Sequence, residues 1–532
     1  MTGPMEATHG SGTGLPRQIP FIIGNEACER FSFYGMRNIL VEFLAKSAIL
    51  AAVAPELRGA EAKEIFHIFV MGVYFFPLLG GWLSDRFFGK YRTIFWLSLV
   101  YCAGHACLAL FESSKAGFFF GLFLIALGSG GIKPCVSAFV GEQFDQRNKH
   151  LAKLVFDAFY WIINFGSFFA SLLIPLVLAK WGASWAFGIP GVLMAVATFI
   201  FWLGRKQYVV EPPRPADAHS FSRVVRTALS SGGGTGSLLS KIGVLGLVVF
   251  EVLALRDAYR IVVADQEPLL GIAQFACLGL VTFLGFGGVG AYRELESARG
   301  QHPDEDIDGV RAVLRVLVVF VPITAFWSLF DQKASTWVIQ GGTMELPSWL
   351  EKASQMQSLN PLLVMALIPL NNLVLYPGLR ALGVNVTPLR KMTVGMVLAG
   401  VSWIIVGIIQ LQIDGGAQLS ILWQVLPYVF LTLGEVLLSA TGLEFAYSQA
   451  PLKMKGVIMS FWSLAVTVGG LWVLLVNSTV KSQSALEAIT STGIGVIAFQ
   501  MFFFAGFAFV AALVFAFIAK HYTLLDNYRK AT

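Results

Sequence analysis

The sequence predicts an all-α polytopic membrane protein. Of its 532 residues, 56% are hydrophobic and only 13% are charged, which is typical of chains that cross a bilayer many times and not of soluble globular domains. Apolar runs long enough to span a bilayer recur along the chain in two sets of six. Two six-helix bundles joined by a linker are typical of a secondary transporter, whose site is expected at the midplane between the halves.

The first set of spans begins close to the N-terminus, and the second follows a long interruption. The first six are predicted near residues 19–50, 65–84, 92–111, 116–141, 155–179 and 185–204. The second six are predicted near residues 311–340, 361–384, 390–412, 420–447, 456–478 and 491–519. We therefore predict a tail at 1–18, an N-terminal bundle at 19–206, a C-terminal bundle at 307–520 and a tail at 521–532.

Residues 207–306 are predicted to link the two bundles. The first part, 207–240, is rich in Pro, Ser and Gly, as exposed linkers are. Two more apolar runs follow near 241–255 and 268–291. The first is short and contains Glu251, which leaves open whether it crosses the bilayer completely.

Basic residues gather in alternate loops, and this asymmetry predicts the orientation. The basic loops and tail contain Arg86, Lys90, Arg92, Arg147, Lys149, Lys153, Arg205, Lys206, Arg380, Arg390, Lys391, Lys453, Lys455, Lys520, Arg529 and Lys530. Because positively charged loops remain on the cytoplasmic side, both termini are predicted to be cytoplasmic, in a plasma membrane or the inner membrane of a bacterium. The net charge of +6 is therefore interpreted as a topology signal, and no nucleic-acid partner is expected.

The first span contains four charged residues in an otherwise apolar helix. An ionisable side chain at the centre of a span costs about 2.5–3.5 kcal/mol, so these residues must pair or face a polar cavity. At 100° per residue, one helix face collects Glu26, Arg30, Tyr34 and Arg37, and Glu29 borders it. Such a polar stripe indicates a pathway for a charged solute or for protons.

The loop after the second span has a recognisable pattern, Gly81-Trp-Leu-Ser-Asp85-Arg86-Phe-Phe-Gly89-Lys90-Tyr-Arg92. It resembles the loop signature of the major facilitator superfamily, and Gly378-Leu-Arg380-Ala-Leu-Gly383 is a weaker echo in the second half. Glycines permit a tight turn between helices, and the Asp85/Arg86 pair can bridge helix ends. The alternative is an ordinary basic loop.

The polar stripe itself, Glu26-Ala-Cys-Glu29-Arg30-Phe-Ser-Phe33-Tyr34, resembles the E-x-x-E-R-F-x-Y-Y signature of the proton-coupled oligopeptide transporter family, with Phe33 in place of the first Tyr. Three further blocks agree: Gly128-Ser-Gly130-Gly131-Ile-Lys133-Pro134, Phe159-Tyr160-Trp161-Ile-Ile-Asn164-Phe-Gly166-Ser167 and Phe326-Trp327-Ser-Leu-Phe-Asp331-Gln332-Lys-Ala-Ser335. The resemblance covers both halves and implies a major facilitator fold. Bacterial members have an extra helix pair where 241–291 lies, which favours 14 spans.

The resemblance implies roles for most of the candidate site residues. Substrate binding is expected of Arg30, Tyr34, Arg37, Tyr74, Lys133, Asn164, Trp327, Asn360, Glu435 and Trp462. Proton coupling is expected of Glu26, Glu29, His67 and Asp331. For Asn360 a helix cap before Pro361 is an equal alternative, and the aromatic residues also fit plain packing.

Two of these expectations have a physical basis in the residues themselves. Lys133 and Asp331 come from opposite halves, and each is costly to bury unpaired. We therefore expect a gating salt bridge, for which a permanent structural ion pair is the alternative. His67 can exchange protons at physiological pH, and the alternative is a histidine merely bonded to its neighbours. His105 matches no block and is expected to be structural.

The function predicted is proton-coupled symport of di- and tripeptides by alternating access. The cations Arg30, Lys133 and Arg37 would bind the peptide carboxylate. At the other end of the cavity, Glu435, Asn164 and Asn360 would bind the α-ammonium group. The alternative is a proton-coupled transporter of another small solute, such as nitrate, an amino acid or a drug, on the same fold.

Other protein classes fit the sequence less well. A primary pump or a membrane enzyme would need a phosphate-binding loop or a catalytic metal cluster. The chain contains no G-x-x-x-x-G-K-[ST] loop and no visible His/Cys/Asp metal cluster. We therefore expect no enzymatic activity, no catalytic or metal-binding residue and no cofactor, with the proton gradient as the driving force. The expected partners are peptides, protons and the lipid bilayer, and a monomer is expected to function.

Overall fold

The computed structural model is helical throughout the residues that it describes, apart from turns and two isolated bridges. These residues are 15–144, 151–213, 217–262, 269–383, 386–449, 451–480 and 483–523. Most of the predicted N-terminal tail and nearly all of the C-terminal tail lie outside them. So do Arg147 and Lys149 of the predicted cytoplasmic loops.

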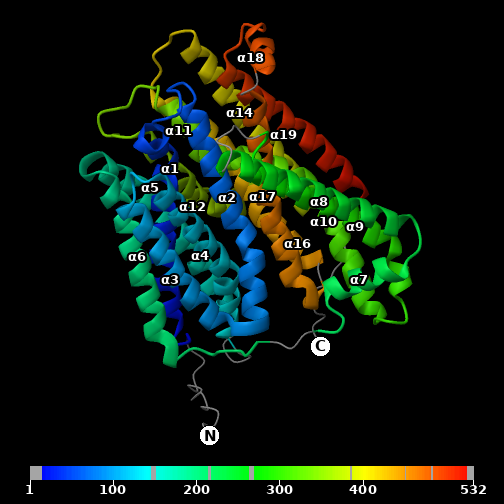
Figure 1. Ribbon diagram of the computed structural model, residues 1–532. Coiled ribbons are helices and arrows are strands. Elements are labelled where there is room, and N and C mark those ends of the chain that lie inside the picture. Colours follow the sequence, from blue (N-terminus) through cyan, green and yellow to red (C-terminus); the bar gives the residue numbers. More distant parts are fainter. Residues whose placement is uncertain are drawn as a thin grey trace. The chain divides into compact units, whose positions relative to one another are not determined.

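The helices of the first 206 residues agree with the first six predicted spans (Figure 1). The long ones are α1 (Ile19–Lys46), α2 (Arg58–Leu83), α3 (Lys90–Leu110), α4 (Lys115–Glu142), α5 (Ala152–Trp181) and α6 (Ala183–Leu203). Single turns adjoin them at η1 (Ala48–Leu50), η2 (Ser84–Phe88) and η4 (Gly204–Lys206).

The linker forms the extra helix pair, and its first member is longer than the sequence indicated. The elements are α7 (Phe221–Ser231), α8 (Thr235–Val262), α9 (Ile272–Glu294) and η5 (Leu295–Ala298). Both α8 and α9 are long and apolar enough to cross a membrane. They pack closely because small residues face each other: a Cβ added to Gly236 would lie 2.5 Å from the Gly290 carbonyl oxygen.

The second half follows the second set of predicted spans. It comprises α10 (Asp304–Asp331), η6 (Gln332–Ala334), α11 (Thr336–Gly341), η7 (Ala353–Ser358), α12 (Leu359–Leu370), η8 (Asn371–Leu375), α13 (Tyr376–Ala381), α14 (Pro388–Asp414), η9 (Ile421–Gln424), α15 (Val425–Glu435), η10 (Val436–Ala440), α16 (Thr441–Gln449), η11 (Leu452–Met454), α17 (Lys455–Val480), α18 (Gln483–Thr490) and α19 (Val496–His521). Across the described residues, 13 helical segments are candidate membrane spans. The charged helix α1 is not among them.

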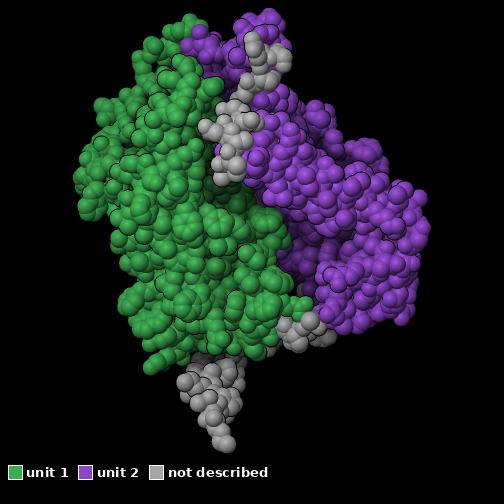
Figure 2. Space-filling view, in the orientation of Figure 1, with its two compact units in different colours: residues 1–215, 332–378, 415–432 green, residues 216–331, 379–414, 433–532 purple. Residues whose placement is uncertain are grey.

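Internal contacts divide the chain into two compact units (Figure 2). Unit 1 contains residues 1–215, 332–378 and 415–432, and unit 2 contains residues 216–331, 379–414 and 433–532. Unit 1 thus includes two segments from the second half of the sequence, because α11, η7 and α12 pack against α1 and α5. The boundaries of the two predicted bundles stay a prediction.

Glycines set the spacing of helices around the fourth span. A Cβ added to Gly80 of α2 would lie only 2.0 Å from the carbonyl oxygen of Gly131 in α4, and one on Gly130 would lie 2.7 Å from the Val73 carbonyl oxygen. The two backbones therefore touch where no side chain intervenes. The Gly-rich stretch that precedes Lys133 supplies the α4 positions of this close approach.

Candidate functional site

The polar stripe of α1 forms a compact ion-pair cluster within unit 1. The Arg30 Nε atom lies 2.9 Å from Glu26 Oε1 and 2.5 Å from Glu29 Oε2. All three side chains are buried, so two carboxylates share one guanidinium group away from water. The predicted pairing of these charges is confirmed. The shared cation is a physical reason for Glu26 and Glu29 to compete.

Lys133 of α4 extends this cluster towards two aromatic rings. Its Nζ atom lies 4.7 Å from the centre of the Phe33 ring and 4.3 Å from the centre of the Tyr74 ring. Both distances suit cation–π interactions, and the ammonium group also interacts electrostatically with Glu26. Phe33, which departs from the family signature, therefore still contacts the lysine through its ring.

The next residues of the stripe also lie among aromatic side chains. The Arg37 guanidinium carbon lies 5.1 Å from the centre of the Phe66 ring, and Arg37 is buried. The Tyr34 ring meets Phe33 edge to face at 5.4 Å and is half-buried. Aromatic faces thus stabilise cations along α1 where a bilayer alone would not.

His67 of α2 is fully buried and bonded to a residue distant in the sequence. Its Nε2 atom lies 3.0 Å from the Ser335 hydroxyl oxygen, which follows η6. Ser335 belongs to the family block that begins at Phe326, and that block predicts no partner for it. Within unit 1, the bond ties α2 to the turn between α10 and α11.

Glu42, near the end of α1, is the centre of a second polar group that sequence reasoning missed. Its carboxylate lies 2.9 Å from Lys352 Nζ and accepts a 2.6 Å hydrogen bond from the Ser354 hydroxyl. Nearby, the Gln357 side chain donates to the Asn38 carbonyl oxygen at 2.8 Å. Another carboxylate in an apolar helix was the signal that could have revealed it.

The two asparagines predicted to bind the substrate amine also lie in unit 1. Asn164 of α5 donates to the Tyr160 carbonyl oxygen one turn earlier, at 3.0 Å. Asn360 donates to the Thr432 hydroxyl oxygen at 3.1 Å. Because α12 begins at Leu359 with Ser358 as its N-cap residue, Asn360 lies inside the helix and does not cap it.

In unit 2, the predicted aromatic residues meet each other. The Trp327 and Trp462 rings are perpendicular, with centres 6.1 Å apart. Both tryptophans are buried. Glycines make room for them, since a Cβ on Gly469 would lie 2.7 Å from the Trp327 Cβ atom and one on Gly442 would lie 2.4 Å from the Trp462 ring.

The acidic candidates of unit 2 both lie where a helix ends or changes pitch. Asp331 is the last residue of α10 and is buried. Glu435 ends α15 and is half-buried, and the π-helical turn η10 follows it directly. Such turns insert an extra residue, re-aim side chains and occur frequently at functional sites.

The predicted loop signature forms a bridge, but through Lys90. The Lys90 Nζ atom lies 2.5 Å from Glu142 Oε1 and 3.7 Å from Asp85 Oδ1, so it links the end of α2 with the end of α4. Gly89 has a φ of +73°, a conformation that favours glycine, and Gly81 lies in the last turn of α2. Arg86 is half-buried in η2.

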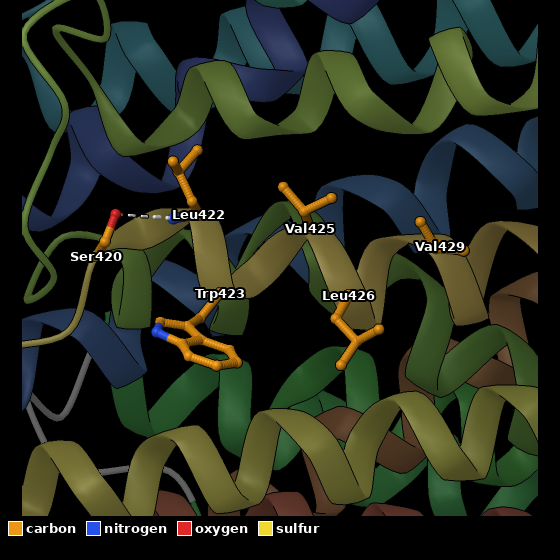
Figure 3. Close-up of a pocket in the computed structure, with 6 residues that line it drawn as sticks. All are labelled: Ser420, Leu422, Trp423, Val425, Leu426 and Val429. Carbon is orange, nitrogen blue, oxygen red and sulfur yellow. Dashed lines mark hydrogen bonds between the residues drawn. The ribbon is translucent and has the colours of Figure 1, made fainter.

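Within each unit the structure thus brings several of the predicted site residues into contact. The salt bridge between Lys133 and Asp331 stays a prediction. Lys133 belongs to unit 1 and Asp331 to unit 2, so their gating salt bridge is not tested. A hollow of about 440 Å³ beside η9 and α15 has an apolar lining and contains none of the predicted residues (Figure 3). Its lining is Ser420, Leu422, Trp423, Val425, Leu426 and Val429.

Comparison with known protein families identifies one match. A model of the POT family matches residues 91–492. The Caenorhabditis elegans protein "Peptide transporter family 1" is 34% identical over 415 residues, which are 75% of this chain and 45% of that protein. "Solute carrier family 15 member 1" of Oryctolagus cuniculus is 32% identical over 432 residues, 75% of this chain and 53% of that protein. The chain spans about half the length of these curated relatives.

Solved structures match over nearly the whole chain. A crystal structure of an auto-inhibited POT family peptide transporter is 61% identical, with a TM-score of 0.91, and the match covers 97% of this chain and 99% of the other. The POT family transporter PepTSo is 60% identical, also with a TM-score of 0.91, over 97% of this chain and 100% of the other.

Proposed function

The chain belongs to the POT family, and from this premise we propose that it carries di- and tripeptides across the membrane together with protons, by alternating access. The observation that carries this proposal is the sharing of Arg30 between Glu26 and Glu29 in a buried helix. A cation held by two carboxylates can be released when one of them takes a proton. Protonation of a glutamate would therefore make the Arg30 guanidinium group available to bind an anion such as the peptide carboxylate.

Peptide recognition is proposed to use the two ends of the substrate. A short peptide carries an α-ammonium and a carboxylate whose separation grows by about 3.3–3.6 Å per residue. Arg30 and Lys133, with Arg37, are proposed to bind the carboxylate. Glu435 is proposed to bind the ammonium, with Asn164 and Asn360 as additional amide groups.

Aromatic side chains are proposed to surround the substrate side chains. The proposed lining is Tyr34, Tyr74, Trp327 and Trp462. Tyr74 already contacts Lys133, and Trp327 contacts Trp462. Aromatic faces accept side chains of many shapes, so a broad peptide preference follows from this proposal.

Proton coupling is proposed to begin at the cluster on α1. Protonation of Glu26 or Glu29 would weaken its pairing with Arg30 and free the guanidinium group for the peptide carboxylate. His67 and Asp331 are proposed to take part in the proton pathway. Lys133 and Asp331 are proposed to form the gating salt bridge, and Gly81, Asp85, Arg86 and Gly89 the conformational loop after α2.

The remaining properties follow from the same proposal. We propose that the protein resides in the cell membrane as a multi-pass monomer with both termini in the cytoplasm, where its basic loops would lie. The partners proposed are peptides, protons and lipid, without nucleic acid. No enzymatic step or cofactor is invoked, since a proton gradient supplies the energy.

Peptide uptake into proteoliposomes tests the proposed function. We expect a labelled dipeptide to accumulate above its external concentration only when an inward proton gradient is imposed, and a protonophore to abolish the accumulation. Nitrate, a free amino acid and a drug serve as competing substrates. Gradient-driven accumulation of one of these without any peptide uptake would favour the alternative, and accumulation without a proton gradient would contradict symport.

A further inference from the structure

A third buried polar group, formed by Ser32 and His105, lies beside the ion-pair cluster in unit 1. His105 of α3 is fully buried, and its Nε2 atom lies 2.9 Å from the hydroxyl oxygen of Ser32 in α1. Ser32 is also fully buried and follows Glu29 by three residues, so the two share neighbouring positions on the helix surface. Losing this bond would leave a buried polar atom without a partner, which is costly in a packed interior.

Tyr101 braces the histidine from one helical turn earlier. The Tyr101 and His105 rings stack with centres 5.0 Å apart and an interplanar angle of 22°. Tyr101 is fully buried and interacts electrostatically with both Glu29 and Arg30. The stacked pair is therefore joined to α1 through the hydrogen bond between His105 and Ser32.

Two glycines on neighbouring helices leave the space that the rings occupy. A Cβ on Gly191 of α6 would lie 2.9 Å from the His105 Cβ atom, and one on Gly128 of α4 would lie 2.7 Å from the Tyr101 Cβ atom. The α6 helix contains no charged residue. The charged groups facing the stack are therefore Glu29 and Arg30 from α1. Lys133 of α4 interacts with Glu26 farther along the stripe.

We propose that His105 is a positioning residue for the Glu29–Arg30 ion pair. The Ser32–His105 bond, braced by Tyr101, holds α1 in the rotation at which the Glu29 carboxylate reaches the guanidinium group. His105 itself touches neither the proton nor the peptide in this role. The inference rests on the proposed function, because the ion pair is where proton and peptide transport are coupled.

The test replaces His105 by a residue of similar volume that forms no hydrogen bond. In His105→Leu we expect gradient-driven dipeptide uptake to fall about two- to tenfold, the effect of one hydrogen bond. We also expect its pH profile to shift. Counterflow of peptide, which needs no gradient, should remain within about twofold of the wild type, because the binding groups are unchanged. His105→Gln keeps an amide that can bond Ser32 and should restore the wild-type pH profile.

Two further variants serve as matched controls. Ser32→Ala removes the same bond from the other side, and its effect combined with His105→Leu should be no greater than that of His105→Leu alone. If His105→Leu fails to fold, Ser32→Ala still tests the bond. His521→Leu changes an exposed histidine at the end of α19 and should leave the pH profile unaltered.

The results distinguish this inference from the proposed function. If the wild type shows no proton-driven uptake, the proposed function fails. Thermal unfolding of His105→Leu, Glu29→Gln and the double variant then decides the positioning role: non-additive shifts support it, and additive shifts overturn it. If the wild type is proton-driven, an unchanged pH profile in His105→Leu and Ser32→Ala, or equal losses in driven uptake and counterflow, overturns the inference.

Discussion

The charged cluster of unit 1 and the tryptophan pair of unit 2 differ in how they are stabilised: the cluster by ion pairs and cation–π contacts, the tryptophan pair by aromatic packing. On α1, two carboxylates neutralise Arg30 within 2.9 Å, and aromatic rings contact the neighbouring Lys133. In unit 2, Trp327 and Trp462 contact each other in space left by glycines, and the half-buried Glu435 lies at a π-helical turn. The first region balances charge, and the second shapes a surface.

The contrast between the two regions predicts where substitutions should affect proton coupling and where they should affect substrate affinity. Removing a charge from a balanced buried cluster leaves its partner uncompensated, so large effects on coupling are expected in unit 1. Changing the shape of an aromatic surface alters contact area and ring position, so graded effects on affinity are expected in unit 2.

Neutralising the carboxylates of α1 should abolish coupling. In Glu26→Gln and Glu29→Gln, Arg30 keeps one charged partner and no proton can switch the other. We expect gradient-driven peptide uptake to be lost while some counterflow persists. The exposed Glu56→Gln, in the loop after α1, is the matched control. Accumulation of peptide by both mutants under a proton gradient would show that coupling lies elsewhere.

Changing Lys133 should stop transport while the fold survives. Lys133→Ala removes a cation that interacts with Glu26, Phe33 and Tyr74, and the exposed Lys115→Ala is its control. The double swap Lys133→Asp with Asp331→Lys should retain stability but not uptake, because the cation then belongs to the other half. Native transport rates in the swapped protein would reduce the pair to a structural role.

Glu435→Gln should weaken the binding of substrates that carry an α-ammonium group more than the binding of those that do not. If the carboxylate holds the α-ammonium, an ordinary dipeptide should lose about ten- to a hundredfold in affinity, the effect of a charged hydrogen bond. An N-acetylated dipeptide, which has no ammonium group, should lose less. Competition assays measure both, with the exposed Glu444→Gln as control. Equal losses for both ligands would place Glu435 in another role, for example as a proton site.

Gly442→Ala should change affinity without changing coupling. The added methyl group would lie 2.4 Å from the Trp462 ring, so the ring must turn. A modest rotamer displacement corresponds to about two- to fivefold in peptide affinity. The pH profile of uptake should stay as in the wild type. A shifted profile would mean that the aromatic surface and the proton site are not separate in function.

Lys453→Met should have the smallest effect, although it breaks an ion pair. The exposed Lys453 donates to Asp306 at 3.0 Å in unit 2, and this hydrogen bond raises the pKa of Lys453. The pair therefore contributes to stability at neutral pH, and the contribution is lost as pH rises through the raised pKa. We expect a thermal midpoint lowered by about 2 °C or less. A change in transport would contradict a purely local role.

Local chemistry in the sequence was enough to predict the helices and the pairing on α1. Helix length follows from apolar runs, and the bond between Glu26 and Arg30 joins residues four apart on one helix, a spacing that periodicity alone places on one face. The family blocks similarly predicted the fold and the membership that the comparisons established.

The sequence predicted a shorter helix than α8 because the apolar run stopped before Arg256 and because 235–240 was assigned to the Pro-, Ser- and Gly-rich linker. Glu251 and Arg256 lie inside the helix, which extends from Thr235 to Val262. Backbone hydrogen bonding continues through an isolated charge, and packing against α9 supports the helix on one side. Hydropathy measures transfer to lipid, so it shortens a helix wherever a polar residue interrupts the run.

Which distant polar groups meet depends on how the helices pack and could not be predicted from the sequence. Ser32 and His105 are 73 residues apart, His67 and Ser335 are 268 apart, and Glu42 and Ser354 are 312 apart. Periodicity reports which face of a helix is polar, but the partner of that face depends on how helices pack, and helix spacing depends on glycines such as Gly191. A buried polar group must find a hydrogen-bond partner. A polar residue in an apolar helix therefore indicates that a partner exists, and the packing of the helices selects which residue that partner is.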